Sequence, residues 1–147
     1  MDGEGGTIAA GGRVDGLYVW PTIVTGVDIA STLAQEEIFG PVLTVFRAEG
    51  EEQAIQIANG VRYGLGASVW TKDIDRALRV VRKLEFGDVW VNTHYVRQAE
   101  TPFGGWKESG VGRELGLAGV REYLAWKRVA IDTSPQFHLK TWFEDES

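Results

Sequence analysis

Residues 41–92 decide the expected fold of this 147-residue chain, and they read PVLTVFRAEGEEQAIQIANGVRYGLGASVWTKDIDRALRVVRKLEFGDVWVN. Three runs of β-branched and apolar residues predict strands at 41–47, 67–71 and 88–92, and the first is typical of a strand covered on both faces. Between them, apolar residues recur at helical spacing: Ala54, Ile57, Ala58 and Val61, then Ile74, Ala77, Leu78, Val81 and Leu84. Asp73 is placed to cap the second helix. The alternation predicts an α/β fold, a parallel sheet with flanking helices and right-handed crossovers.

The flanking segments are less regular. In chain order they predict a flexible or edge-lying glycine-rich segment (1–16), a strand-like run interrupted by Pro21 (17–24), a short helical turn (28–35), an irregular stretch (93–112), a helix (about 113–124) and a last strand (126–131). The chain therefore divides into a flexible segment at 1–16, a folded part at 17–132 and a polar tail at 133–147.

Composition excludes several classes of protein. Fifteen Lys and Arg against 21 Asp and Glu give a net charge of −6, which argues against nucleic acid or an anionic membrane as partner. No apolar run approaches the roughly 20 residues of a membrane span, and the first residues lack the basic and apolar regions of a signal peptide. We therefore expect a cytoplasmic protein with no membrane partner.

The absence of cysteine narrows the chemistry further. It excludes a disulfide framework, a cysteine-ligated metal site and a cysteine nucleophile within these residues. The only histidines are His94 and His138, so a three-histidine metal site is impossible and we predict no metal.

Three local patterns have a functional and a structural interpretation. The glycine run at 110–116 resembles a dinucleotide loop, but the preceding residues 106–109 are not strand-like, so a turn into a helix is favoured. Glu36 and Glu37 are adjacent, so their side chains diverge, which makes them a poor acid/base pair. The loop at 102–107 follows a predicted strand, where open α/β sheets place their sites, and it is equally compatible with a packed connection.

Several motifs in register resemble the NAD(P)-dependent aldehyde dehydrogenase superfamily. They are QEEIFGPV at 35–42, AN at 58–59 with YGL at 63–65, GDVWVN at 87–92, PFGGWK at 102–107 with SG at 109–110 and GRE at 112–114, and Tyr123 with Lys127. The resemblance covers about residues 3–132 and concerns only the carboxyl-terminal part of the family's catalytic domain.

The resemblance implies roles for individual residues. Glu37 matches the glutamate that binds the nicotinamide ribose, Phe39 matches the aromatic residue beside the nicotinamide, and the cofactor implied is NAD or NADP. Glu114 matches a buried carboxylate of a proton relay. Phe103 matches an aromatic residue of the aldehyde tunnel. Residues 95–101 align with the variable loop that shapes substrate choice; within it Tyr95 is a candidate substrate residue, and Arg97 and Glu100 suggest a polar or charged aldehyde.

The resemblance also shows what these residues lack. The family's Rossmann-type domain, its general-base glutamate and its nucleophilic cysteine have no counterpart here, so we expect a truncated enzyme that is inactive alone and binds the cofactor weakly or not at all. Two alternatives are a non-enzymatic module for self-association or partner binding, and an enzyme half complemented by a separate N-terminal half. Apolar residues that the full enzyme covers, and the strand at 126–132, predict a homo-oligomer.

Overall fold

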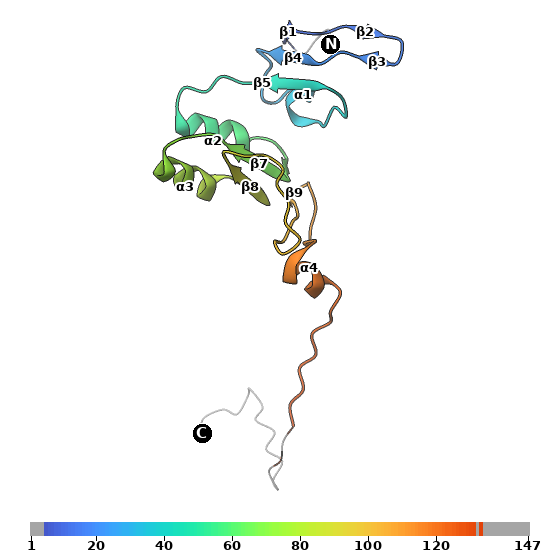
Figure 1. Ribbon diagram of the computed structural model, residues 1–147, viewed down its shortest axis with the longest axis vertical. Coiled ribbons are helices and arrows are strands. Elements are labelled where there is room, and N and C mark those ends of the chain that lie inside the picture. Colours follow the sequence, from blue (N-terminus) through green and yellow to red (C-terminus); the bar gives the residue numbers. More distant parts are fainter. Residues whose placement is uncertain (1–4, 132, 134–147) are drawn as a thin grey trace, which may run out of the picture.

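The computed structural model describes residues 5–131 and residue 133, and the chain is elongated (Figure 1). The elements in chain order are β1 (Thr7–Ala10), β2 (Val14–Asp15), β3 (Tyr18–Val19), β4 (Thr22–Thr25), α1 (Thr32–Gln35), β5 (Val42–Val45), α2 (Glu51–Asn59), β6 (Tyr63–Gly64), β7 (Gly66–Val69), α3 (Ile74–Lys83), β8 (Asp88–Val91), β9 (Trp106–Lys107) and α4 (Gly116–Glu122). The α/β class predicted from the sequence is confirmed.

The first sheet contains β1, β4 and β5 in that order, with β4 antiparallel to β1 and parallel to β5. Residues 1–16 were expected to be flexible or to lie along an edge, and β1 agrees with the second alternative, since it pairs with β4 at the edge of the first sheet; β2 forms a hairpin with β3. Strand pairing gives the backbone N–H and C=O groups of this segment partners that a flexible segment would leave to water.

Pro21 divides the strand that we expected at 17–24 into β3 and β4. Proline lacks an N–H and cannot continue a ladder, so the chain crosses between the two strands here. The buried Thr22 supports the crossing, since its hydroxyl donates to the Trp20 carbonyl at 2.8 Å and accepts from the Gly12 N–H at 2.9 Å.

A second parallel pair, β7 and β8, is connected through α3. Asn92, just after β8, fixes the end of the pair because its amide bonds both the N–H and the C=O of Thr71. The expected strands at 41–47, 67–71 and 88–92 therefore all form, but β5 pairs with β4 and not with β7 or β8. One continuous parallel sheet was predicted, and two separate parallel pairs are observed.

The faces of these elements differ from expectation. The strand β5 was expected to be covered on both faces, but its residues alternate between partial burial and exposure, and Leu43 is 59% exposed. On α2 the buried residue is Ile55, whereas Ala54 of the predicted stripe is exposed. In both cases an apolar face lacks the neighbour that would cover it.

The C-terminal region contains less regular structure than expected. The helix predicted at about 113–124 is the shorter α4, and the strand predicted at 126–131 is absent, since residues 124–131 are exposed and assigned to no element. A strand needs a partner for its N–H and C=O groups, and none of the described residues pairs with this segment. The predicted polar tail, apart from Thr133, lies outside the described residues. None of the helices in the described part is long and apolar enough to span a bilayer.

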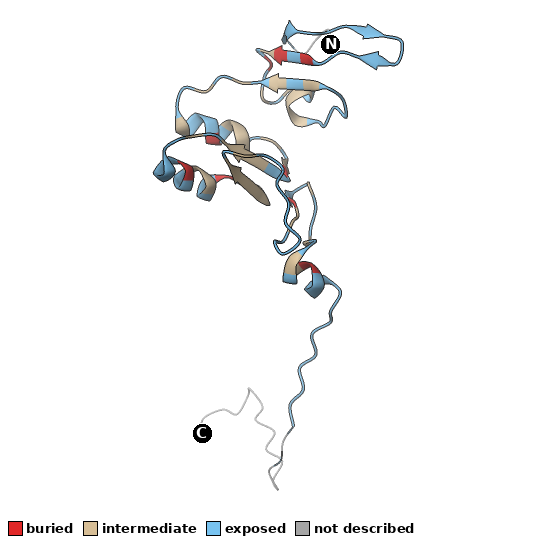
Figure 2. Ribbon diagram, in the orientation of Figure 1, coloured by how far each residue is buried: buried red, intermediate tan, exposed pale blue. Residues whose placement is uncertain are grey.

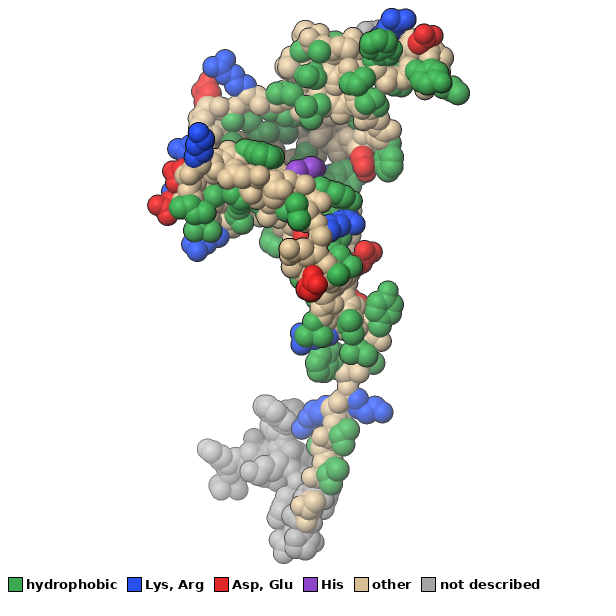
Figure 3. Space-filling view, in the orientation of Figure 1, with side chains coloured by type: hydrophobic (Ala, Val, Ile, Leu, Met, Phe, Trp, Pro, Cys, Tyr) green, Lys and Arg blue, Asp and Glu red, His purple; other side chains and the backbone are tan. Residues whose placement is uncertain are grey.

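The core is small for a chain of this length. Among the described residues the buried apolar side chains are Val24, Val27, Ile55, Ala77 and Leu84 (Figure 2). The chain exposes 12,158 Å² of surface; a compact monomer of 16.2 kDa exposes about 7,500 Å². Hydrophobic side chains gather on the surface over the N-terminal strands and along the C-terminal segment (Figure 3). Much of this surface is suited to contact with other protein.

The helix α3 allows a direct test of local stability. The Asp73 carboxylate accepts the N–H of Arg76 at 3.0 Å, and this backbone hydrogen bond lowers the pKa of Asp73 below its ordinary value. A carboxyl whose pKa is lowered in the folded state contributes stability above its unfolded pKa and loses it as the pH falls through the folded pKa. We expect Asp73→Ala to lower the thermal midpoint of the helical circular dichroism signal by about 3 °C at pH 7.

The matched control is Asp73→Asn, which keeps a capping oxygen but cannot titrate. This variant should stay close to the wild-type midpoint at pH 7. In acid its midpoint should lack the decrease that protonation of Asp73 causes in the wild type. An Asp73→Ala midpoint equal to that of the wild type would contradict a capping role.

Candidate functional site

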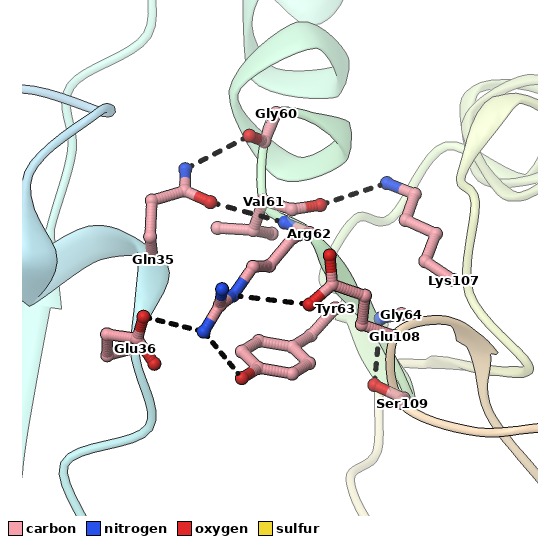
Figure 4. Close-up of polar contacts among 10 residues, drawn as sticks. All are labelled: Gln35, Glu36, Gly60, Val61, Arg62, Tyr63, Gly64, Lys107, Glu108 and Ser109. Carbon is pink, nitrogen blue, oxygen red and sulfur yellow. Dashed lines mark hydrogen bonds and ion pairs between the residues drawn. The ribbon is translucent and has the colours of Figure 1, made fainter.

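The segment that carries Glu37 and Phe39 leads from α1 into β5 and is held in place by Gln35. The Gln35 side-chain amide donates to the carbonyl of Ile29 at 2.7 Å. It also donates to the carbonyl of Gly60 at 3.0 Å, and its oxygen accepts the N–H of Arg62 at 3.2 Å (Figure 4). These bonds fasten the end of α1 to the connection between α2 and β6.

Arg62 links three segments of the chain. Its guanidinium donates to Glu36 at 2.6 Å and to the Tyr63 hydroxyl at 3.0 Å, and it lies 3.6 Å from the Glu108 carboxylate (Figure 4). The hydrogen bond to the Tyr63 hydroxyl raises the pKa of Arg62, and the neighbouring carboxylates add to this effect, so the group stays charged at every accessible pH. Because the group is exposed, the cluster orients these segments more than it stabilises them.

Lys107 and Ser109 fasten the C-terminal loop to the same connection. The Lys107 ammonium donates to the carbonyls of Asn59 at 2.7 Å and Val61 at 3.2 Å, where it satisfies carbonyl groups at the end of α2, and it pairs with Glu85 at 3.0 Å. The Ser109 hydroxyl accepts the Gly64 N–H at 3.0 Å. The β6–β9 pairing adds main-chain bonds between the same segments.

A cavity of about 530 Å³ lies at this junction. Its lining includes Glu36 and Glu37 from the segment before β5, Tyr63 and Leu65, and Ser109. Glu37 therefore faces the cavity, whereas Phe39, in a left-handed conformation at φ 49°, does not line it and is 90% exposed. Glu37 and Phe39, the two residues expected at the cofactor, lie on one segment, but their side chains do not face the same cavity.

The residues expected at the substrate do converge. The Arg97 guanidinium carbon lies 3.7 Å from the centroid of the Phe103 ring and 4.6 Å from that of the Tyr95 ring. The main chain of Phe103 pairs with that of Glu114, with N–O distances of 2.8 and 2.7 Å. Tyr95, Arg97, Phe103 and Glu114 thus form one group around the loop that follows β8.

Glu114 differs from expectation in its environment. The resemblance implied a buried carboxylate, but Glu114 is exposed and lines an open cavity of about 340 Å³ together with Phe103 and Arg113. This cavity shares Leu65 and Ser109 with the cavity that contains Glu37, so the two adjoin.

The loop at 102–107 is a packed connection that also lines a cavity, so its structure is compatible with both interpretations. Phe103 lines the cavity, while the backbone of Gly104 packs so closely on Gly87 that a Cβ on Gly87 would overlap the Gly104 carbonyl oxygen. The absence of a side chain at Gly87 therefore lets the loop reach the start of β8. The glycine run at 110–116 leads into α4, as expected of a turn. No group of three potential metal ligands occurs in the part of the chain that the structure describes.

A family model described as "Aldehyde dehydrogenase family" matches residues 2–129. The chain belongs to the aldehyde dehydrogenase family. The resemblance stated from the motifs is thereby confirmed.

Individual relatives agree with this assignment. Betaine aldehyde dehydrogenase from Cereibacter sphaeroides is 47% identical over 135 residues, which are 90% of this chain and 28% of the relative. Geranial dehydrogenase from Castellaniella defragrans is 45% identical over 130 residues, 86% of this chain and 27% of the relative. A crystal structure of betaine aldehyde dehydrogenase from Staphylococcus aureus in complex with NAD+ is 48% identical, with a TM-score of 0.85 over 95% of this chain and 29% of that chain. This aldehyde dehydrogenase chain thus spans less than a third of the length of these relatives.

Sequence reasoning missed the residues that position the site: Gln35, Arg62, Lys107 and Ser109. Gln35, Lys107 and Ser109 lie inside the quoted family motifs but were given no role. Their partners are mainly backbone groups, and such partners leave no pattern in the sequence. The only signal for Gln35, Lys107 and Ser109 in the sequence was their place inside the family motifs.

The bonds of Gln35 predict a measurable effect on the chain. We expect Gln35→Ala to lower the free energy of unfolding by about 1–2 kcal/mol in urea titrations, because three hydrogen bonds are lost. The Arg62 amide should also exchange its hydrogen faster, since it loses its acceptor.

The control is Gln56→Ala on the exposed side of α2, where the side chain makes no hydrogen bond to a described residue. This change should alter the free energy of unfolding by less than about 0.5 kcal/mol. Equal effects of the two substitutions would argue against the anchoring role of Gln35.

Proposed function

We propose that this chain is the distal part of the catalytic domain of an NAD(P)-dependent aldehyde dehydrogenase and forms one wall of its cofactor and substrate sites. The observation that carries the proposal is the junction of two cavities at Leu65 and Ser109. Glu37 lines one cavity, and Phe103 and Glu114 line the other. Side chains expected at the nicotinamide ribose and in the aldehyde tunnel therefore face adjoining spaces.

The residues present fit part of a nicotinamide dinucleotide. The Glu37 carboxylate is an acceptor suited to ribose hydroxyl groups, and the exposed Phe39 ring offers a flat apolar face to a nicotinamide ring. The related enzyme from Staphylococcus aureus has been solved in complex with NAD+. When bound, the cofactor would accept a hydride from the aldehyde carbon.

Oxidation of an aldehyde to a carboxylate also needs a nucleophile and a water molecule. The resemblance assigns the first attack to a cysteine thiolate, and the 147 residues contain no cysteine. We propose that the nucleophile belongs to a part of the enzyme outside these residues and that the chain alone is inactive. The chain would hold the ribose through Glu37, shape the aldehyde tunnel through Tyr95, Arg97 and Phe103, and exchange a proton at the Glu114 carboxylate.

The exposed apolar surface supports a second candidate function, self-association or binding of a partner chain. Leu124, Trp126, Val129 and Ile131 are all exposed on a segment without secondary structure. Such a segment can gain strand pairing and apolar burial from a second copy or from a separate N-terminal half of the enzyme. We propose that one of these partners covers it.

The activity of the chain tests the first proposal. We expect the isolated chain to form no NADH above the blank with NAD+ and an aldehyde.

A chimera tests the proposed role of Glu37. Residues 5–131, joined in place of the matching segment of the Cereibacter sphaeroides enzyme, should restore oxidation of butanal. In this chimera Glu37→Ala should raise the KM for NAD+ by about tenfold, as expected for one hydrogen bond to a charged group.

The matched control is Glu49→Ala, a loop glutamate outside both cavities, which should leave the KM unchanged. Formation of NADH by the isolated chain that is sensitive to Glu37→Ala would overturn the proposed inactivity. A folded chimera without activity toward any aldehyde would overturn the proposed function.

Light scattering after size exclusion separates the first proposal from the second. We expect the isolated chain to elute as a dimer or a larger species, because its apolar faces need cover. Replacing Trp126 and Ile131 together by serine should shift this species toward the monomer, and the same change at Lys127 and Arg128 should not. A monodisperse monomer at all concentrations would contradict a self-association function.

A further inference from the structure

The strongest unexplained feature of the candidate site is the position of Arg97. Its guanidinium carbon lies 3.7 Å from the centroid of the Phe103 ring and 4.6 Å from that of the Tyr95 ring. Both distances are within the range of a cation–π contact. The two aromatic faces that border the substrate loop are thus in contact with a positive charge that belongs to the protein.

The loop holds Arg97 at this place through both of its neighbours. The Trp90 indole N–H donates to the carbonyl of Val96 at 2.8 Å, and the Gln98 carbonyl accepts from the N–H and the hydroxyl of Thr101. The Ala99 carbonyl also accepts the N–H of Gly116, at the start of α4. The backbone on either side of Arg97 is therefore fixed, so the side chain starts from a defined position.

The charge of Arg97 is not neutralised by the residues that surround it. Within the described part of the chain no carboxylate lies within 4.0 Å of its guanidinium, and its nitrogens donate to no described acceptor. Glu100, in the same loop, and Glu114, whose main chain pairs with that of Phe103, are the acidic residues of this group, and neither forms an ion pair with Arg97. A planar guanidinium with free N–H groups is suited to bind a carboxylate through two parallel hydrogen bonds.

We propose that Arg97 selects the substrate and that the aldehyde carries a carboxylate at the end remote from its carbonyl group. This inference rests on the proposed function. A quaternary ammonium group would seek the same aromatic faces, because aromatic rings bind such cations, but Arg97 already contacts them and repels a second positive charge. This chain thus prefers an ω-oxo acid, in contrast to the betaine aldehyde of the relatives that bear that name.

A titration of the full 147-residue chain tests the binding step without any enzyme activity. The probes are succinate and tetramethylammonium, and the readout is the chemical shift of the ring protons of Tyr95 and Phe103. Succinate should shift these signals in the wild type and in Arg97→Lys, but not in Arg97→Ala. Tetramethylammonium should shift them only in Arg97→Ala.

The same titration contains the results that overturn the proposal. A response to tetramethylammonium in the wild type would show that the rings are open to a cation. An equal response to succinate in the wild type and in Arg97→Ala would show that Arg97 does not hold the anion. Arg47→Ala, in the connection between β5 and α2, is the control for loss of charge alone.

The chimera described above extends the test to catalysis, with 4-oxobutanoate, butanal and betaine aldehyde as substrates. Arg97→Ala should lower the ratio of kcat/KM for 4-oxobutanoate to kcat/KM for butanal by about 10- to 100-fold, as expected for the loss of a charge-assisted hydrogen-bonded pair. It should raise kcat/KM for betaine aldehyde. Activity toward butanal reports on the proposed function, so its loss and the loss of selectivity are separate results.

If the chimera oxidises butanal but prefers betaine aldehyde to 4-oxobutanoate, the proposed substrate class is wrong. An equal decrease of kcat/KM for all three aldehydes in Arg97→Ala would also contradict the proposed substrate class. It would indicate that a carboxylate from the rest of the enzyme neutralises Arg97, so that the arginine does not bind the substrate.

Discussion

The connection between α2 and β6 is the point on which the arrangement of the site depends. A connection of this kind leaves backbone N–H and C=O groups without partners, because the helix has ended and the strand has barely begun. Here side chains distant in sequence supply the partners: Gln35 bonds Gly60 and Arg62, Lys107 bonds Asn59 and Val61, and Ser109 bonds Gly64. The segment before β5 and the loop after β9 are therefore fastened to one short stretch of backbone, and the two cavities adjoin there.

The candidate site is open rather than closed. Phe39 is almost fully exposed, Glu114 is exposed although its family counterpart was expected to be buried, and both cavities are open. The apolar side of β5 and the segment at 124–131 are uncovered as well. The chain spans less than a third of the length of these relatives, and exposed apolar faces of this kind are suited to contact with further protein.

Charge distinguishes the two parts of the site. Acidic side chains, Glu36, Glu37 and Glu108, line the cavity proposed for the cofactor, and Arg62 binds two of them. The loop proposed to bind the substrate instead presents Arg97 against two aromatic rings. The protein has a net charge of −6, yet Arg97 has no acidic partner among the described residues. This unpaired positive charge can attract an anion to the loop.

The sequence by itself determined the elements of this protein and their class. The alternating apolar runs at 41–92 predicted the strands β5, β7 and β8 and the helices α2 and α3, and Asp73 marked the start of α3, because periodicity and capping are local properties of the chain. The family was also contained in the sequence, since its motifs occur in order and at the right spacing.

Only the tertiary structure decided which strands pair, because an unbroken β-branched run is equally suited to either neighbour. It also decided that the strand expected at 126–131 does not form, because no partner among the described residues lies beside it. The anchors Gln35, Lys107 and Ser109 and the stacking of Arg97 on Tyr95 and Phe103 appear only in three dimensions, because each contact joins a side chain to a group whose nearness the folded backbone creates.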